Sequence, residues 1–140
     1  MIRYLGLDIG SVRIGVALSD PLGHFAQGIA LLKASGDWVG ETAALIDKWG
    51  VSVVVVGLPL RTGGEEGPEA LRVRRKMEVL AERRPGLEIV FYDERFTTVI
   101  AERVLLEADL SRKKRRGKID QTAAAVLLQG YLDGLRGAGQ

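Results

Sequence analysis

The chain has 140 residues, of which 46% are hydrophobic and 27% are charged, and its formal net charge is +2. This composition is ordinary for a globular protein, and the length suits a single hydrophobic core. No apolar run is long enough for a membrane-spanning helix, and the absence of cysteine excludes disulfides and thiolate metal ligands. The first residues lack the layout of a signal peptide, so we expect a cytoplasmic protein.

The charge is unevenly distributed along the sequence. Residues 1–60 hold four Lys or Arg and five Asp or Glu, whereas residues 61–140 hold sixteen and thirteen. Such an uneven distribution on a nearly neutral chain favours a polyanionic partner at one edge of the molecule. A solvated loop explains the same composition equally well. The basic cluster responsible consists of Arg112, Lys113, Lys114, Arg115, Arg116 and Lys118.

The first part of the chain predicts three strands. Residues 1–8 are apolar at their central positions, Gly10 interrupts this pattern, and residues 13–19 resume it. We therefore expect these two segments to pair as a hairpin. Residues 25–33 form a plausible third strand.

Helices and strands then alternate. Asp37 caps a helix that ends near Trp49, and the β-branched run at 51–56 predicts a strand buried on both faces. Pro68 fits the first turn of a second helix, which ends near Arg84. The apolar positions expected to face the core from these two helices are Trp38, Ala44, Leu45, Trp49, Leu71, Met77 and Leu80.

The last part of the chain predicts one more strand and two helices. Residues 87–92 form the strand, Thr97 or Thr98 caps a short helix to about Asp109, and the final helix spans about 119–135 after a basic loop. The order of elements predicts an α/β fold with a mixed five-stranded sheet and helices on both faces. No linker is evident, so we expect one domain over residues 1–137 and a flexible tail at 138–140.

Asp8 is the first candidate for a functional side chain. It lies inside an apolar strand, where an unpaired carboxylate is costly. Metal coordination and a hydrogen bond to a turn are alternative reasons for its presence. Gly10 and Gly15 beside it would allow a phosphate backbone to approach closely.

Asp120 is the second candidate, because it heads an apolar helix stripe. A carboxylate in that position points towards the sheet, where small residues at 123–125 would let the helix lie close to the strands and to Asp8. The alternative is a charge that only stabilises the start of a helix. The other members of the stripe are Ala123, Ala124, Leu127, Leu128 and Tyr131.

The third acidic group follows the fifth strand, at Asp93 and Glu94. Adjacent strand residues face opposite ways, so only one of the two shares the face of Asp8. Glu94 is longer and is the preferred choice, while Asp93 would cap the following turn. The choice between Asp93 and Glu94 as the third acidic group remains open at this point.

Three carboxylates from two strand ends and a helix could supply oxygen ligands for Mg²⁺ or Mn²⁺. Two such ions can stabilise both the attacking and the leaving oxygen of a phosphodiester displacement. The single histidine, His24, lies in a predicted loop and is expected at the surface.

Several ordered motifs resemble the YqgF/RuvX nuclease family. They span residues 5–132, nearly the whole chain, and the ordered set is far more specific than any one of them. The motifs are Leu7-Asp8-Ile9-Gly10 with Arg13-Ile14-Gly15-Val16-Ala17, Val56-Gly57-Leu58-Pro59-Leu60, Tyr92-Asp93-Glu94-Arg95-Phe96-Thr97-Thr98, and Lys118-Ile119-Asp120 with Ala123-Ala124-Ala125.

This resemblance implies a ribonuclease H-like fold and a hydrolase, namely a divalent-metal-dependent endonuclease related to Holliday junction resolvases. It carries the catalytic, metal-binding role onto Asp8, Glu94 and Asp120, with two ions of Mg²⁺ or Mn²⁺. It implies either maturation of the 5′ end of 16S ribosomal RNA precursor or resolution of branched DNA, the latter favouring a homodimer. Related families often take a ligand from the fourth strand, but here that strand ends in Gly57-Leu58-Pro59.

Basic residues near the acidic ones are candidates for nucleic-acid binding. Arg13 and Arg95 could hold phosphates or merely neutralise neighbouring carboxylates. The basic cluster at 112–118 could follow a nucleic-acid backbone by contacts that do not depend on base sequence. The loop at 62–67 could act as a flap, although its two glutamates oppose direct contact with phosphate.

Two other classes of protein share some of these features. The glycines around Asp8 also resemble the phosphate loop of sugar kinases and actin-like ATPases, which need a second lobe that 140 residues do not supply. A non-catalytic nucleic-acid-binding module would keep the carboxylates for structural reasons. Metal-dependent cleavage separates the expected nuclease from both alternatives.

Overall fold

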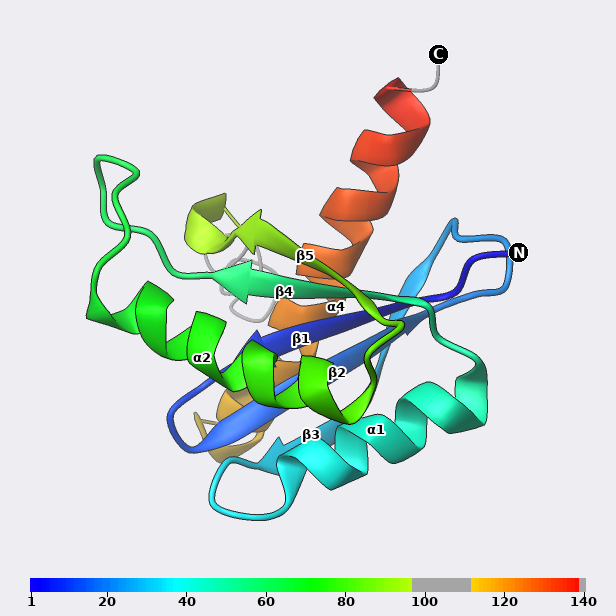
Figure 1. Cartoon of the computed structure of the whole chain (residues 1–140). Coiled ribbons are helices and arrows are strands. Elements are labelled where there is room, and N and C mark those ends of the chain that lie inside the picture. The colour runs from blue at the N-terminus through cyan, green and yellow to red at the C-terminus, as the bar shows by residue number, and fades with distance from the viewer. Residues whose placement is uncertain (97–111, 139–140) are drawn as a thin grey trace.

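The computed structural model describes residues 1–96 and 112–138, with side chains described at 1–95 and 123–137 (Figure 1). Five strands form one sheet in the order β3-β2-β1-β4-β5. The elements are β1 (Tyr4–Ile9), β2 (Arg13–Ser19), β3 (Ala26–Lys33), α1 (Trp38–Trp49), β4 (Val53–Leu58), α2 (Pro68–Arg83), β5 (Glu88–Asp93), the short 3₁₀ helix η1 (Glu94–Phe96) and α4 (Arg112–Ala138).

The sheet is mixed, as the order of predicted elements requires. β1, β2 and β3 pair antiparallel in sequence order, whereas β1 pairs with β4 and β4 with β5 in parallel. The turn between β1 and β2 is closed by Gly10, whose N–H donates to the Arg13 carbonyl at 2.9 Å. A Cβ at Gly10 would lie 2.4 Å from that carbonyl oxygen, so this tight turn requires glycine.

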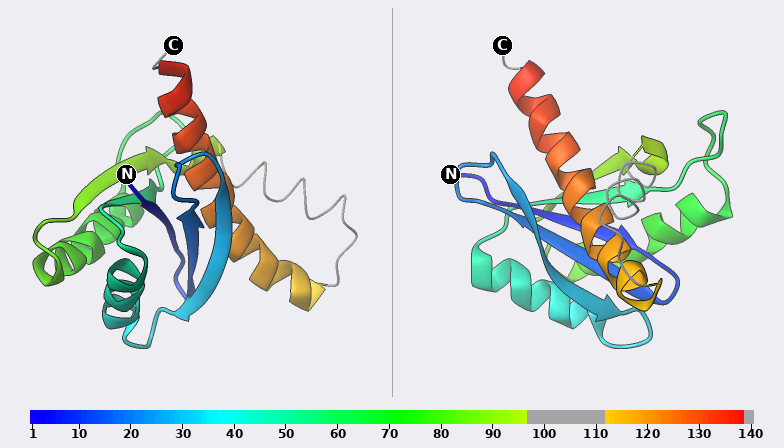
Figure 2. Two further views of the ribbon diagram at one scale, coloured as in Figure 1. Left: turned by 90° about the vertical axis from the view of Figure 1, so that its right-hand side faces the viewer. Right: turned by 180° about the vertical axis from the view of Figure 1, so that it is seen from behind.

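Helices cover both faces of the sheet, which confirms the predicted architecture. α1 and α2 lie on one face, and α4 crosses the other face (Figure 2). Asp37 caps α1, as the sequence predicts, because its Oδ1 accepts a hydrogen bond from the Gly40 N–H at 3.1 Å. Among the helices within the described part of the chain, none combines the length and the apolar character needed to cross a membrane.

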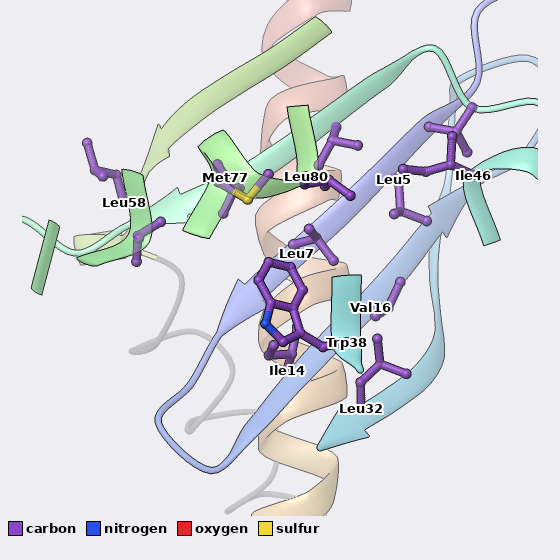
Figure 3. Packing of buried hydrophobic residues seen from close by; sticks show 14 of the residues in the cluster. Leu5, Leu7, Ile14, Val16, Leu32, Trp38, Ile46, Leu58, Met77 and Leu80 are labelled. Carbon is purple, nitrogen blue, oxygen red and sulfur yellow. The ribbon is translucent and has the colours of Figure 1, made fainter. Parts of the chain in front are cut away.

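Alternating side chains divide the core into two layers. Leu5, Leu7, Val54 and Val56 face α1 and α2, where they pack with residues such as Met77 (Figure 3). The intervening residues of the same strands face α4 instead. β4 is buried along its whole length, as its β-branched sequence predicts.

α4 lies close to β1 because small residues meet where the two elements cross. Ala124 is fully buried, and Gly6 of β1 lies directly beneath it. A Cβ at Gly6 would lie 2.9 Å from Leu128 Cβ and 3.1 Å from the Ala124 carbonyl oxygen. The backbone of α4 therefore lies very close to the backbone of β1 at this point.

Some predicted details are wrong. α4 begins at Arg112 and not near residue 119, so the basic cluster lies in helix and not in a loop. Arg and Lys are good helix formers, and no capping residue precedes residue 119 to mark a later start. Leu71 is 48% exposed and Trp49 is 36% exposed, and Ala44 is also exposed. The helix predicted from Thr97 or Thr98 to Asp109 lies outside the described residues.

Candidate active site

The candidate site lies where β1, β4 and β5 end, at the carboxyl edge of the parallel strands. Asp8 is next to the last residue of β1, and Glu94 immediately follows β5. Gly6 and Tyr92, two residues earlier in each case, both face α4. By alternation, Asp8 and Glu94 lie on that same face of the sheet.

The structure brings Asp8 and Glu94 into direct contact through a hydrogen bond between their side chains. Burial raises the pKa of Glu94 to about 8, and the hydrogen bond and negative charge of Asp8 add to this effect. Burial also raises the pKa of Asp8, against the opposing effect of its hydrogen bond with Glu94. When no cation is present, these raised pKa values favour one bound proton on the pair at neutral pH.

Gly57 of β4 provides the space for Glu94. A Cβ at this position would lie 3.3 Å from both Cδ and Oε2 of Glu94, and 2.7 Å from Leu127 Cδ1 of α4. β4 thus contributes no carboxylate here, and the absence of a side chain lets the Glu94 carboxyl occupy the space above the strand. The sequence shows the glycine, but the register that puts it beneath Glu94 is a property of the fold.

Asp93 points away from the pair and has a different partner. Its carboxylate accepts hydrogen bonds from the Arg95 Nε at 2.9 and 3.0 Å and from the Arg95 backbone N–H at 3.0 Å. The hydrogen bonds from Arg95 hold the pKa of Asp93 below its usual value. Asp93 therefore shapes the turn after β5, while Glu94 meets Asp8.

Arg95 also ties a neighbouring loop to this turn, since its Nη1 donates to the Thr62 carbonyl at 3.1 Å. This guanidinium neutralises Asp93, which is the simpler of its two predicted roles. Phosphate binding by Arg95 stays a prediction. Arg13, the first residue of β2, is partly buried, and its predicted contact with phosphate is likewise untested.

Asp120 lies within α4, and its side chain is outside the described part of the structure. One alternative role for Asp120 was a charge that only stabilises the start of a helix. In the structure α4 starts at Arg112, so Asp120 is two turns inside the helix. The helix dipole acts mainly within the first turn, so it no longer explains an acidic residue at this position. Among the side chains that are described, no three His, Cys, Asp or Glu form a possible metal-binding group.

The basic cluster occupies the first two turns of α4, which crosses the same face as the acidic pair. The side chains of Arg112, Lys113, Lys114, Arg115, Arg116 and Lys118 are not described, so their role in nucleic-acid binding stays a prediction. His24 is exposed in the loop between β2 and β3, as expected from the sequence.

Sequence reasoning overlooked a cavity of about 240 Å³ beside the acidic pair. Glu94 lines it together with Gly10, and α2 contributes Arg72 and Lys76. The only available signal was the spacing of these two basic residues by one helical turn, which is common on solvent-facing helices.

The strand order and the helices on both faces define a ribonuclease H-like fold, which solved resolvases share. Thermus thermophilus RuvC, in complex with Holliday junction substrate, matches with a TM-score of 0.61 and 14% identity over 97% of each chain. Fowlpox virus resolvase, in complex with Holliday junction DNA, matches with a TM-score of 0.59 and 12% identity over 96% of this chain and 99% of that chain. At these identities the likeness concerns the fold.

The family follows from sequence comparison. The family model described as "RuvX: Holliday junction resolvase" matches residues 2–134. A Moorella thermoacetica protein named "Putative pre-16S rRNA nuclease" is 51% identical over 95% of this chain and 96% of its own length. A Clostridium kluyveri protein of the same name is 49% identical over 94% and 96%. The chain belongs to the RuvX family.

Proposed function

We propose that this chain is a cytoplasmic, divalent-metal-dependent endonuclease that hydrolyses phosphodiester bonds in structured nucleic acid. The observation that carries the proposal is the pair of partly buried, hydrogen-bonded carboxyl groups of Asp8 and Glu94. Two buried carboxylates in contact repel each other unless a proton or a cation lies between them. Such a pair is costly for stability, which favours a functional reason for it.

The residues present fit a hard divalent cation. Asp8 and Glu94 offer carboxylate oxygens, the ligands that Mg²⁺ and Mn²⁺ prefer, and both lie at the end of the sheet. Asp120 precedes the buried residues Ala124 and Leu127 of α4 by four and seven positions, the spacing of residues that share one helix face, and this spacing supports a place for it beside the sheet. We assign it as the third ligand. One or two bound ions would stabilise charge on the phosphate and activate water.

The chain's own residues prepare this site in three ways. Asp8 is held rigidly in the centre of the sheet, where β1 pairs with both β2 and β4. Gly57 leaves space for Glu94, and the Asp93–Arg95 pair fixes the turn from which Glu94 extends. Loss of the shared proton frees both carboxylates to bind the cation, so binding should strengthen as the pH rises.

We propose precursor 16S ribosomal RNA as the substrate. The relatives that match nearly the whole chain at 49–51% identity carry the name of nucleases for this RNA. Branched DNA is the second candidate, since the family model is described as a Holliday junction resolvase and the fold matches resolvases with bound junctions. Symmetric cutting of a junction would need a homodimer, whereas cutting one RNA strand would not.

Cleavage of two labelled substrates tests the proposal directly. The purified chain is incubated with a precursor 16S leader RNA and with a four-way DNA junction, each with Mg²⁺, Mn²⁺ or EDTA. We expect metal-dependent cuts that disappear in Asp8→Asn and Asp120→Asn proteins. Preferential cutting of the RNA supports ribosomal RNA processing, and paired cuts in the junction support resolution.

A matched control separates the effect of removing a carboxylate of the site from the effect of removing a carboxylate elsewhere. Asp47→Asn removes an exposed aspartate at the opposite end of the sheet and should cleave like the wild-type protein. Binding of both substrates without cleavage under any metal condition would favour the non-catalytic binding module. Cleavage that persists in Asp8→Asn protein would remove the acidic pair from the mechanism.

A further inference from the structure

The cavity beside the acidic pair lies between the carboxyl edge of the sheet and α2. Its volume is about 240 Å³, and its walls come from the turn after β1, from Pro59 after β4, from Glu94 and from one face of α2. Cavities for whole drug-sized ligands measure about 300–1,000 Å³. This smaller cavity suits one segment of a longer molecule that continues beyond its rim.

The α2 wall of the cavity carries two basic side chains. Arg72 and Lys76 lie one helical turn apart, and the buried Val73 between them holds this face of the helix against the core. Glu69 lies one turn before Arg72 and contributes one carboxylate to the same wall. The helix therefore presents two positive charges and one negative charge to the cavity.

These basic residues differ from Arg74 on the same helix, which serves the fold. Arg74 donates to both carboxylate oxygens of Glu66, at 2.6 and 2.9 Å, and stacks over the Phe91 ring at 4.4 Å from its centre. Arg72 and Lys76 take part in none of the ion pairs or hydrogen bonds between described side chains. Their charges are available to a ligand.

We propose that Arg72 and Lys76 form a phosphate-binding subsite that holds the nucleic-acid backbone beside the bond to be cut. The inference rests on the proposed function, because Glu94 is shared between the acidic pair and the cavity. An acidic site repels a polyanion, and positive charges on its border offset this repulsion. Ser11, exposed on the turn after β1, offers a hydroxyl at the rim.

Binding measured in EDTA tests the subsite independently of cleavage. The affinity of the Arg72→Ala/Lys76→Ala protein for the leader RNA and for the four-way junction is measured as a function of salt concentration. Loss of two phosphate contacts should make the plot of log K against log salt shallower by about 1.4–1.8. Arg72→Lys, which keeps the positive charge, should retain most of the wild-type slope.

The matched control is Lys48→Ala/Arg83→Ala, which also removes one Lys and one Arg. Both residues are exposed in the last turns of α1 and α2, away from the cavity. This protein should keep the wild-type slope, and thermal melting of both doubles checks that each is folded. If the doubly substituted cavity protein does not fold, the single Arg72→Ala and Lys76→Ala proteins should each lower the slope by about half as much.

The outcomes distinguish this inference from the proposed function. If the cavity variant and the control variant, each with two substitutions, show equal slopes of log K against log salt, the subsite is overturned even if the wild-type protein cleaves. A shallower slope for the cavity double supports the subsite even if no cleavage is found. A wild-type protein that binds neither nucleic acid overturns both proposals.

Discussion

Acidic residues have different surroundings at the two ends of the sheet. At one end, Asp8 and Glu94 are partly buried and share a hydrogen bond, although both are acids. At the other end, Asp47 of α1 is exposed and accepts a hydrogen bond from the Arg84 Nε at 2.9 Å. The first end therefore contains a partly buried pair of acids beside the Asp93–Arg95 pair, whereas the acid at the other end has only an exposed partner of opposite charge.

This difference is the reason for proposing the Asp8 end as the functional one. An exposed pair of opposite charges changes the free energy of unfolding only slightly. A buried pair of like charges raises the pKa of both groups and makes folding less favourable whenever both are ionised. A chain keeps such an arrangement where a cation or a reaction uses it.

The largest expected effect comes from Glu94→Gln, which keeps the shape of the side chain and removes its charge. Metal-dependent cleavage should fall by about 100-fold or more, because one carboxylate ligand is lost. Single-turnover rates with saturating Mg²⁺ or Mn²⁺ measure the change. Glu82→Gln, on the exposed face of α2, is the control and should leave the rate unchanged. Equal rates for both variants would contradict a role for Glu94.

Stability in EDTA should fall as the pH rises. The pKa of Glu94 is raised from 4.5 to about 8, so the folded state binds a proton more tightly than the unfolded state between these values. The free energy of unfolding should therefore decrease by about 2–3 kcal/mol between pH 5 and pH 8. Urea unfolding at several pH values measures it.

Two comparisons sharpen this pH prediction. Glu94→Gln should flatten the dependence and make the metal-free protein more stable than wild type at pH 8, even though we expect the same variant to lose cleavage. Saturating Mg²⁺ should stabilise the wild-type protein at pH 8 more than at pH 5, because the cation replaces the shared proton. A wild-type profile in EDTA that is flat, or that rises with pH, would show that the two carboxyls do not share a buried proton.

Gly57→Ala tests the space above β4. Its Cβ would lie 2.7 Å from Leu127 Cδ1 and 3.3 Å from the Glu94 carboxyl, so α4 or Glu94 must move. We expect a loss of about 1–3 kcal/mol in the free energy of unfolding, and a loss of cleavage in the folded protein. Gly86→Ala, at the opposite end, adds a Cβ with no atom within 4 Å and should have little effect on either measurement.

Most of the fold could be predicted from the sequence because its signals are local. The β-branched run in β4, the cap at Asp37 and Pro68 at the start of α2 each depend on a few neighbouring residues. The start of α4 was missed because a basic cluster opposes the helix dipole there, yet the helix forms.

The site was only partly predictable, because its geometry depends on register between distant strands. Alternation along β5 indicated that only one of Asp93 and Glu94 would lie beside Asp8, and the length of the side chain favoured Glu94, which the structure places in contact with Asp8. The position of Gly57 beneath Glu94 depends on the pairing of β4 with β5, which no local pattern encodes. The α2 wall of the cavity depends on tertiary packing in the same way.

The smallest effect is expected from Asp47→Asn, which breaks the exposed pair with Arg84. Salt screens such a pair, so the melting temperatures of the variant and the wild type should differ slightly at low salt and converge at 1 M NaCl, where the screening length is about 3 Å. The pH dependence that arises from Glu94 should be the same in both proteins. A large difference that persists at 1 M NaCl would mean that the Asp47 end also depends on its charges, and the contrast between the two ends of the sheet would no longer identify the site.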